Sequence, residues 1–171
     1  MNDYYQKQLA AGQEYQDFIA DQLWDLRKWR VQNYTSARYQ LTKGENSQGL
    51  EIKHDTLMKK TGNLYIEISE CADPYHPHFP SGIYAGHSIC YLIGDYERAF
   101  LFYTDLLQNI HRRQLYRTIS IPRTTSRGFL LPIKDVRRMG WIIDEILFPP
   151  DDSKLSSKEP PVLPSQPTPP A

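Results

Sequence analysis

The first regular pattern of apolar positions spans residues 13–29 and repeats every three or four residues, as a helix with one buried face requires. Its stripe consists of Tyr15, Phe18, Ile19, Gln22, Leu23 and Leu26. The remaining positions are mostly polar and include four acids, Glu14, Asp17, Asp21 and Asp25. The pattern predicts an amphipathic first helix with an acidic exposed side.

A two-residue alternation follows at residues 50–55, which read Leu-Glu-Ile-Lys-His-Asp. Because alternate side chains of a strand share one face, we expect Glu51, Lys53 and Asp55 to lie together. The sequence Thr-Gly-Asn at residues 61–63 favours a tight turn, and the apolar run at residues 64–68 predicts a returning strand. The pattern therefore predicts a β-hairpin that brings Glu67 beside the charged face of the first strand.

Further strands and helices are predicted in the second half of the chain. Two apolar runs at residues 88–93 and 99–103 predict a second hairpin that extends the sheet. Residues 104–113 predict a helix that begins at a Thr104 cap, and residues 128–133 predict an edge strand because they contain Pro132. Residues 136–148 predict a last helix, capped by Asp135.

These elements indicate one α/β domain over residues 1–148, with a central mixed β-sheet flanked by helices. Eight of the thirteen prolines lie in residues 149–171, so we expect a disordered proline-rich tail there. The sequence contains no apolar run long enough for a membrane span and no secretory start, and we expect a cytoplasmic protein. Its two cysteines are then expected to be free thiols.

Charge is distributed unevenly along the chain, although 20 Lys and Arg balance 20 Asp and Glu. The first helix is acidic, whereas residues 111–138 contain eight cationic residues and one acid, Asp135. Such a segment produces a local positive field that suits a polyanion, and a solvated basic face is the alternative. The residues predicted to contact DNA are Arg112, Arg113, Arg117, Arg123, Arg127, Arg137 and Arg138.

Residues 45–70 resemble the PD-(D/E)XK nuclease superfamily, also called restriction-endonuclease-like. That family carries an acid on its first helix, an acid on a β-hairpin, and a second acid followed two residues later by lysine. Asp55 matches the first hairpin acid and Glu67 the second. The strings GEN, GLEIKHD and TGNLYIE are also similar to segments of small phage and prophage proteins. The resemblance implies a restriction-endonuclease-like core.

The resemblance departs from the family pattern at the lysine, because Ser69 stands two residues after Glu67. Lys53 precedes Asp55 on the same predicted face, and a lysine on a neighbouring strand takes this place in some divergent members. A second register uses Glu51-Ile52-Lys53 as the tripeptide and Glu45 as the preceding acid. This register ranks lower, because the few residues between Glu45 and Glu51 leave too little chain for a complete hairpin.

The resemblance implies a metal-dependent endonuclease or exonuclease that hydrolyses DNA phosphodiester bonds. Lys53, Asp55 and Glu67 would be catalytic, and the metal would be held by Asp55, Glu67, the Ile68 carbonyl and Glu14, with Glu51 as an additional candidate. An oxygen-rich site suits Mg²⁺ or Mn²⁺. The expected partner is DNA, and whether the protein is a monomer or a homodimer is left open.

Two other hypotheses compete with a nuclease. A non-catalytic protein with the same fold would bind DNA or a protein through its basic residues, and Ser69 in the lysine position favours this hypothesis. In the second, Glu51, Lys53 and Asp55 pair along an exposed strand at about 1 kcal/mol or less per pair and bind no metal. Whether Lys53 points at the Asp55 and Glu67 carboxylates or away from them distinguishes the nuclease from the non-catalytic protein.

Overall fold

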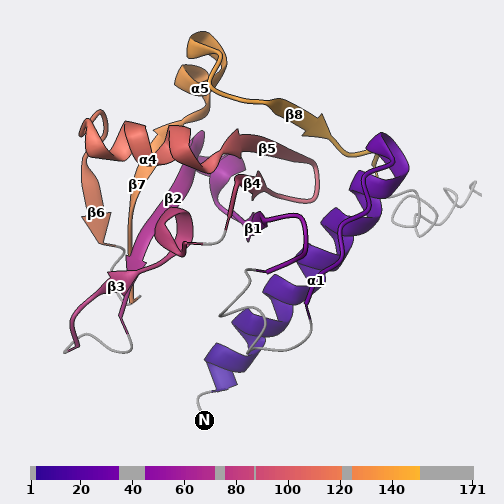
Figure 1. Ribbon diagram of the computed structural model, residues 1–171, viewed down its shortest axis with the longest axis horizontal. Helices are drawn as coiled ribbons and strands as arrows, with labels where there is room; N and C mark the ends of the chain where they lie inside the picture. The colour runs from indigo at the N-terminus through magenta and orange to yellow at the C-terminus, as the bar shows by residue number, and fades with distance from the viewer. Residues whose placement is uncertain (1–2, 35–44, 72–75, 87, 121–124, 151–171) are drawn as a thin grey trace, which may run out of the picture.

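The protein is described by a computed structural model that covers residues 3–34, 45–71, 76–86, 88–120 and 125–150 (Figure 1). Arg123 and most of the predicted tail lie outside these ranges. The elements are α1 Asp3–Arg27, β1 Leu50–His54, α3 Met58–Thr61, β2 Asn63–Glu70, β3 Phe79–Pro80, η1 Gly82–Tyr84, β4 Cys90–Gly94, β5 Arg98–Tyr103, α4 Thr104–Arg112, β6 Thr118–Ser120, β7 Ser126–Pro132, α5 Ile133–Met139 and β8 Asp144–Leu147.

The strands form two four-stranded sheets rather than the one central sheet that was predicted. The first has the order β1-β4-β5-β8, in which β1 runs parallel to β4 and the other pairs are antiparallel. The second has the order β3-β2-β7-β6 and is antiparallel throughout. The prediction of a mixed α/β fold is confirmed, including a mixed sheet and the β4–β5 hairpin.

The predicted hairpin of β1 and β2 is wrong, because the two strands belong to different sheets. The short helix α3 stands between them, and its first residue, Met58, is buried. Gly62 then reverses the chain at a φ of 69°, a left-handed conformation that glycine adopts at little cost. The reversal directs β2 to β7 instead of back along β1.

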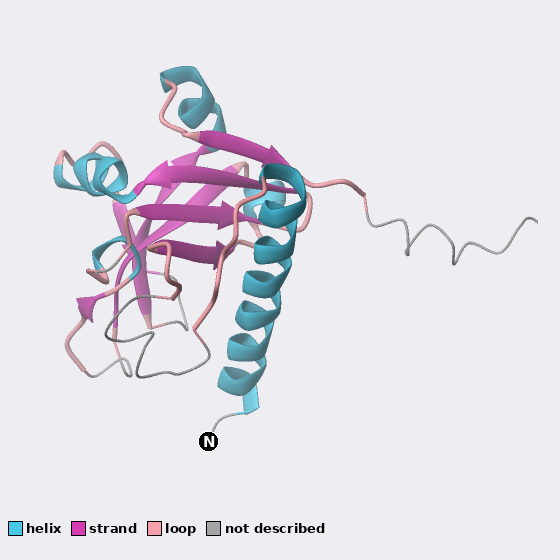
Figure 2. Cartoon of the chain, turned by 45° about the vertical axis from the view of Figure 1, so that its right-hand side comes forward, coloured by secondary structure: helices cyan, strands magenta, loops and turns pink. Residues whose placement is uncertain are grey.

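Helix α1 covers one face of the first sheet and runs across its strands (Figure 2). Tyr15, Ile19 and Leu23 are fully buried and pack with Leu50 and Ile52 of β1. The predicted apolar stripe is thereby confirmed, although the helix begins ten residues earlier and its Leu26 is exposed. This packing fixes which way β1 faces, because its residues 50 and 52 must point toward the helix.

A second core lies between the two sheets. Phe100 and Phe102 of the first sheet pack in it with Leu64, Ile66 and Phe129 of the second. Since residues 50 and 52 face α1, residues 51 and 53 of β1 face the opposite side, toward this second core. The charged alternation of β1 is therefore turned into the protein instead of toward solvent.

The end of the domain differs from its prediction. Helix α5 ends at Gly140, which has a φ of 63°, and the predicted 136–148 helix is replaced beyond this point by β8. Ile146 is buried while Leu147 is exposed, so these residues alternate as a strand and complete the edge of the first sheet. Asp135 does not cap α5, but accepts hydrogen bonds from Tyr116 and Arg138.

Two smaller predictions are also corrected. Thr104 is the first residue of α4 rather than its cap, and its hydroxyl lies 3.4 Å from the Ser88 hydroxyl. The β7 strand lies between β2 and β6 instead of at an edge, and Pro132 is accommodated because it is the last residue of that strand. None of the helices in the described ranges has the length and apolar character needed to cross a membrane.

Candidate functional site

The three residues predicted to be catalytic, Lys53, Asp55 and Glu67, line one cavity of about 440 Å³. Its wall also contains Tyr65 of β2 and Tyr91 of β4. The cavity lies where β1, at the edge of the first sheet, approaches β2 of the second. Residues that were expected to meet within one hairpin therefore meet across two sheets.

Lys53 forms ion pairs with two other glutamates of the site. Its ammonium nitrogen is 2.7 Å from Glu51 Oε1 and 3.4 Å from Glu45 Oε1. The second oxygen of Glu45 accepts the Ile52 N–H at 2.9 Å. Lys53 thus points toward the acids of the second register, Glu45 and Glu51, rather than bonding to those of the first.

A compact turn, and not a hairpin, brings Glu45 to Lys53. The Asn46 side chain accepts the Leu50 N–H at 3.0 Å and donates to the Leu50 carbonyl, which closes residues 46–50 into a turn. The backbone of Glu45 pairs with Tyr34 on its other side. As expected, no complete hairpin separates Glu45 from Glu51 in the described residues, but the turn is enough to bring Glu45 to the lysine of the second register.

Burial governs the electrostatics of this trio. Only 7% of Glu51 is exposed, and burial raises the pKa of Glu45, a change that the Lys53 charge only partly offsets. Burial opposes the charge on Lys53, yet the Glu51 and Glu45 carboxylates outweigh it and hold the pKa of Lys53 well above its usual value. Lys53 is therefore a permanent cation. The burial of Glu51 also excludes an exposed charge ladder along β1.

Asp55 is bound by the backbone on both carboxylate oxygens. Oδ1 accepts the Leu57 N–H at 3.0 Å, and Oδ2 accepts the Tyr65 N–H at 2.9 Å. These bonds join the end of β1 to α3 and to the part of β2 that β3 does not pair. Asp55 lines the cavity, but its two hydrogen bonds indicate a structural role in holding the sheets together.

A β-bulge in β2 determines which residues accompany Glu67. Glu67 pairs with Gly128 of β7, and the register shifts by one residue so that Ser69 pairs with Arg127 and Glu70 with Ser126. Since directly paired residues share a face, the bulge aligns Glu67 with Glu70 and turns Ser69 to the opposite face. Ser69 therefore does not occupy the spatial position of the family lysine, and Glu70 is an acid that the sequence interpretation missed.

Hydroxyl groups hold the carboxylate of Glu67. Ser81 donates to Oε1 at 2.6 Å and Ser126 donates to Oε2 at 2.7 Å. The Tyr65 hydroxyl lies 2.9 Å from the Ser126 oxygen, so Tyr65, Ser126 and Glu67 form a chain. Burial and the nearby Glu67 charge raise the pKa of Glu70. The neighbourhood thus contains more negative charge than Lys53 neutralises.

Tyr91 was not predicted, and it is fully buried beside Glu51, its partner in the parallel β1–β4 register. Its hydroxyl is buried and has no hydrogen-bond partner within the described residues. Buried hydroxyls are usually bonded, so an orphaned one at a cavity wall indicates a place for a bound water, ion or ligand atom. Burial raises the pKa of Tyr91 well above its usual value, and the hydroxyl is therefore a neutral donor.

The other predicted ligands do not join this group. Glu14 is exposed on α1, where its charge acts on His54 and Tyr96 on the helix-covered side of the first sheet. The Ile68 carbonyl accepts the Ser81 N–H at 3.2 Å. Of the ligands implied by the resemblance, Asp55 and Glu67 alone line the cavity.

The predicted DNA-contacting arginines fall into two groups. Arg137 bonds Glu145 at 2.9 Å and Arg138 bonds Asp135 at 3.1 Å, so part of their charge is neutralised. The members of the other group are exposed and have no carboxylate partner among the described residues; they are Arg112, Arg113, Arg117 and Arg127. Glu145 lies outside residues 111–138, so the surface around Arg137 is less positive than the composition of that segment indicates.

The donor chemistry of the site suits a hard cation, because Glu45, Glu51, Glu67 and Glu70 supply carboxylates in excess of one ammonium. The orphaned Tyr91 hydroxyl adds a further oxygen. In the described part of the chain, no three His, Cys, Asp or Glu side chains already stand close enough to hold a metal ion.

Comparison of the chain with protein-family models, with curated proteins and with solved structures found no match.

Proposed function

We propose that the protein is a divalent-metal-dependent nuclease with a restriction-endonuclease-like core, acting on DNA. One observation carries this proposal. Strand β1 carries Lys53 on the wall of a cavity that Glu67 also lines, and the same lysine is paired with Glu51 and Glu45. This combination of acids and one permanent cation suits phosphodiester hydrolysis.

Glu51 and Glu67 are the carboxylates that would hold Mg²⁺ or Mn²⁺. Asp55 and the Ile68 carbonyl accept backbone N–H groups that are fixed by the fold, whereas the donors to Glu67 are serine hydroxyls, which can rotate. When bound, the ion supplies a Lewis acid that polarises the phosphodiester and lowers the pKa of a coordinated water. Ser81 and Ser126 hold Glu67 in place. This ligand set retains Glu67 from the first register and takes Glu51 from the second.

Lys53 would stabilise the negative charge that develops on phosphorus. Its pKa, held high by Glu51 and Glu45, keeps it protonated, so it acts as a charged hydrogen-bond donor and not as a base. Tyr91 would donate its free hydroxyl to a phosphate oxygen or to a bound water. In the net reaction water adds to phosphorus, the P–O bond to the leaving nucleotide breaks, and the leaving oxygen takes a proton.

Nuclease assays with Mg²⁺ or Mn²⁺ on circular, linear duplex and single-stranded DNA test this proposal. We expect cleavage by the wild type and a loss of about 100-fold or more in Lys53→Met and Glu67→Gln. Lys60→Met and Asp105→Asn, which change exposed residues outside the cavity, are matched controls and should cleave normally. Glu67→Gln keeps an acceptor for Ser81, and thermal melting verifies that each variant is folded.

A second candidate is a non-catalytic protein of the same fold that binds DNA. The bonding of Asp55 and Glu67 by protein donors favours it, since neither carboxylate needs a metal to be satisfied. In that case all variants would leave the DNA equally intact, and calorimetry would detect no Mn²⁺ binding that depends on Glu51 and Glu67. This result would overturn the nuclease proposal.

A further inference from the structure

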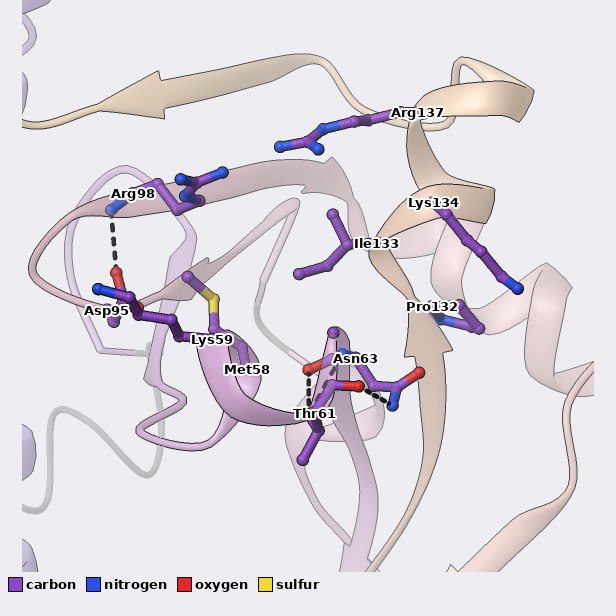
Figure 3. Close-up of a pocket in the computed structure, with 11 residues that line it drawn as sticks. Met58, Lys59, Thr61, Asn63, Asp95, Arg98, Pro132, Ile133, Lys134 and Arg137 are labelled. Carbon is purple, nitrogen blue, oxygen red and sulfur yellow. Dashed lines mark hydrogen bonds between the residues drawn. The ribbon is translucent and has the colours of Figure 1, made fainter.

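A second cavity, of about 630 Å³, opens beside the candidate site (Figure 3). It lies between the α3–β2 turn and the segment where β7 passes into α5, and β5 also contributes to it. Four cations line it, namely Lys59, Arg98, Lys134 and Arg137. A cavity of this size accommodates a small ligand or part of a polymer.

The single lining carboxylate, Asp95, is already occupied by the backbone. Its Oδ1 accepts the Glu97 N–H at 2.8 Å and the Arg98 N–H at 3.0 Å, closing the β4–β5 turn. Asp95 therefore serves the fold and leaves the cations of the cavity largely unopposed from within.

The cations retain donors for an incoming anion. Arg98 and Arg137 approach from β5 and α5 and share one carboxylate, Glu145, at 3.7 Å and 2.9 Å. Each guanidinium has five N–H donors, so one shared acid leaves several unused. Lys59 is paired with Glu97 at the exposed surface, where such a pair contributes little. Lys134 has no ion pair among the described residues.

The two cavities are neighbours, because Thr61 and Asn63 line both of them. These residues form the turn from α3 into β2, which Gly62 reverses. The two cavities therefore share this turn as a common wall. We call the cavity lined by Asp55 and Glu67 the acidic cavity and the cavity lined by the four cations the basic cavity. A polymer that occupied both cavities would have to cross that turn.

We infer that the basic cavity is a phosphate subsite for a polynucleotide whose scissile phosphate lies in the acidic cavity. This inference rests on the proposed nuclease function and extends it. Phosphate is the ligand class that paired guanidinium groups recognise through planar, bidentate hydrogen bonds. The subsite includes Lys59 and Arg98, which lie outside the basic segment that composition singled out.

Oligonucleotide binding, measured under conditions in which no cleavage occurs, tests the subsite separately from catalysis. The full chain carrying Glu67→Gln, in chelator, is titrated with a fluorescent single-stranded oligonucleotide bearing either a 5′-phosphate or a 5′-hydroxyl. We expect Lys59→Gln with Lys134→Gln to weaken binding by about tenfold and to reduce the salt dependence by one to two phosphate contacts. Lys28→Gln with Lys60→Gln removes the same charge from exposed lysines outside both cavities and should have a smaller effect.

Inorganic phosphate locates the site by its shifts of the amide resonances of Gly62, Asn63 and Lys134. Loss of affinity for both oligonucleotides in the cavity variant supports contacts to internal phosphates, and loss confined to the 5′-phosphate form supports a terminal phosphate. Equal binding by the cavity and control variants, or shifts with phosphate but no oligonucleotide binding, would overturn the inference. A protein that binds through this cavity but never cleaves would refute the nuclease proposal and leave the subsite standing.

Discussion

At the scale of single residues, the carboxylates of the site differ in the groups to which they are bonded. Glu45 and Glu51 form ion pairs with Lys53. Glu67 accepts hydrogen bonds from two serines, and both oxygens of Asp55 accept backbone N–H groups. The sequence pattern treats Asp55 and Glu51 alike, since both lie on the charged side of the β1 alternation. Only the hydrogen bonds in the structure show that Asp55 stabilises the fold and that Glu51 is the candidate ligand.

Asp55→Ala tests this separation. We expect it to lower the free energy of unfolding by about 1–3 kcal/mol, because it leaves the partly buried Leu57 and Tyr65 N–H groups without their acceptors. Asp105→Ala, which changes an exposed acid on α4, should change stability by less than about 0.5 kcal/mol. Urea unfolding followed by circular dichroism measures both. An Asp55→Ala protein as stable as the wild type that no longer binds Mn²⁺ would identify Asp55 as a ligand instead.

At the scale of elements, the pairing of β2 with β7 builds half of the site. The bulge brings Glu70 to the Glu67 face, and Ser126 of β7 reaches Glu67 from the neighbouring strand. Gly128 makes this possible, since the Tyr65 ring passes close above it on the way to Ser126. Gly128, the β2 bulge and the hydrogen bonds from Tyr65 through Ser126 to Glu67 therefore all depend on the pairing of β2 with β7.

Gly128→Ala should disrupt this surface. A Cβ at this position would lie 2.3 Å from the Ile66 carbonyl oxygen and 2.8 Å from the Tyr65 ring, distances that force the strands or the ring to move. We expect a loss of about 2–4 kcal/mol in unfolding free energy and a weakened Tyr65–Ser126 contact, seen as changed tyrosine fluorescence.

Gly12→Ala is the matched control for that substitution. Gly12 lies inside α1 with no atom within 4 Å of an added Cβ, so the substitution should stabilise the protein by roughly 0.5–1 kcal/mol through helix propensity. If Gly128→Ala were as stable as Gly12→Ala, the close approach of Tyr65 to β7 would be refuted.

At the scale of the whole molecule, the region where the two sheets meet contains an excess of negative charge, and the pH dependence of stability should report it. The raised pKa of Glu70 means that the folded state keeps its proton to higher pH than the unfolded chain does. Its contribution to stability is therefore present below the usual glutamate pKa of about 4.5 and is lost as pH rises through the folded-state pKa.

Wild type and Glu70→Gln should consequently differ in the pH dependence of unfolding. The variant, measured by urea midpoint, should gain stability relative to the wild type as pH rises above about 4.5, and saturating Mn²⁺ should reduce that gain by stabilising the wild type. Glu97→Gln is a control of opposite sign, because hydrogen bonding to Lys59 lowers the pKa of Glu97. If the urea midpoints of Glu70→Gln and Glu97→Gln depended on pH in the same way, the pH effect would not originate in the surroundings of Glu70.

The sequence by itself determined the elements that form from neighbouring residues, and those in which buried positions recur at the regular spacing of a helix or a strand. The 3.6-residue stripe of α1, the β4–β5 hairpin and the α4 helix follow from such patterns. The alternation at residues 50–55 likewise predicted that Glu51 and Lys53 share a face, because the period of a strand is independent of its partners.

Tertiary structure alone decided which strands pair and which groups each charged side chain contacts. The parallel partner of β1 comes from residues 90–94, the bulge that turns Ser69 away requires β7, and β8 replaces a helix because its residues bury against β5. The orphaned hydroxyl of Tyr91 and the common wall of the two cavities also arise from segments far apart in the chain. Periodicity tells which face of an element is buried, but the partner that buries it is selected by packing across the whole molecule.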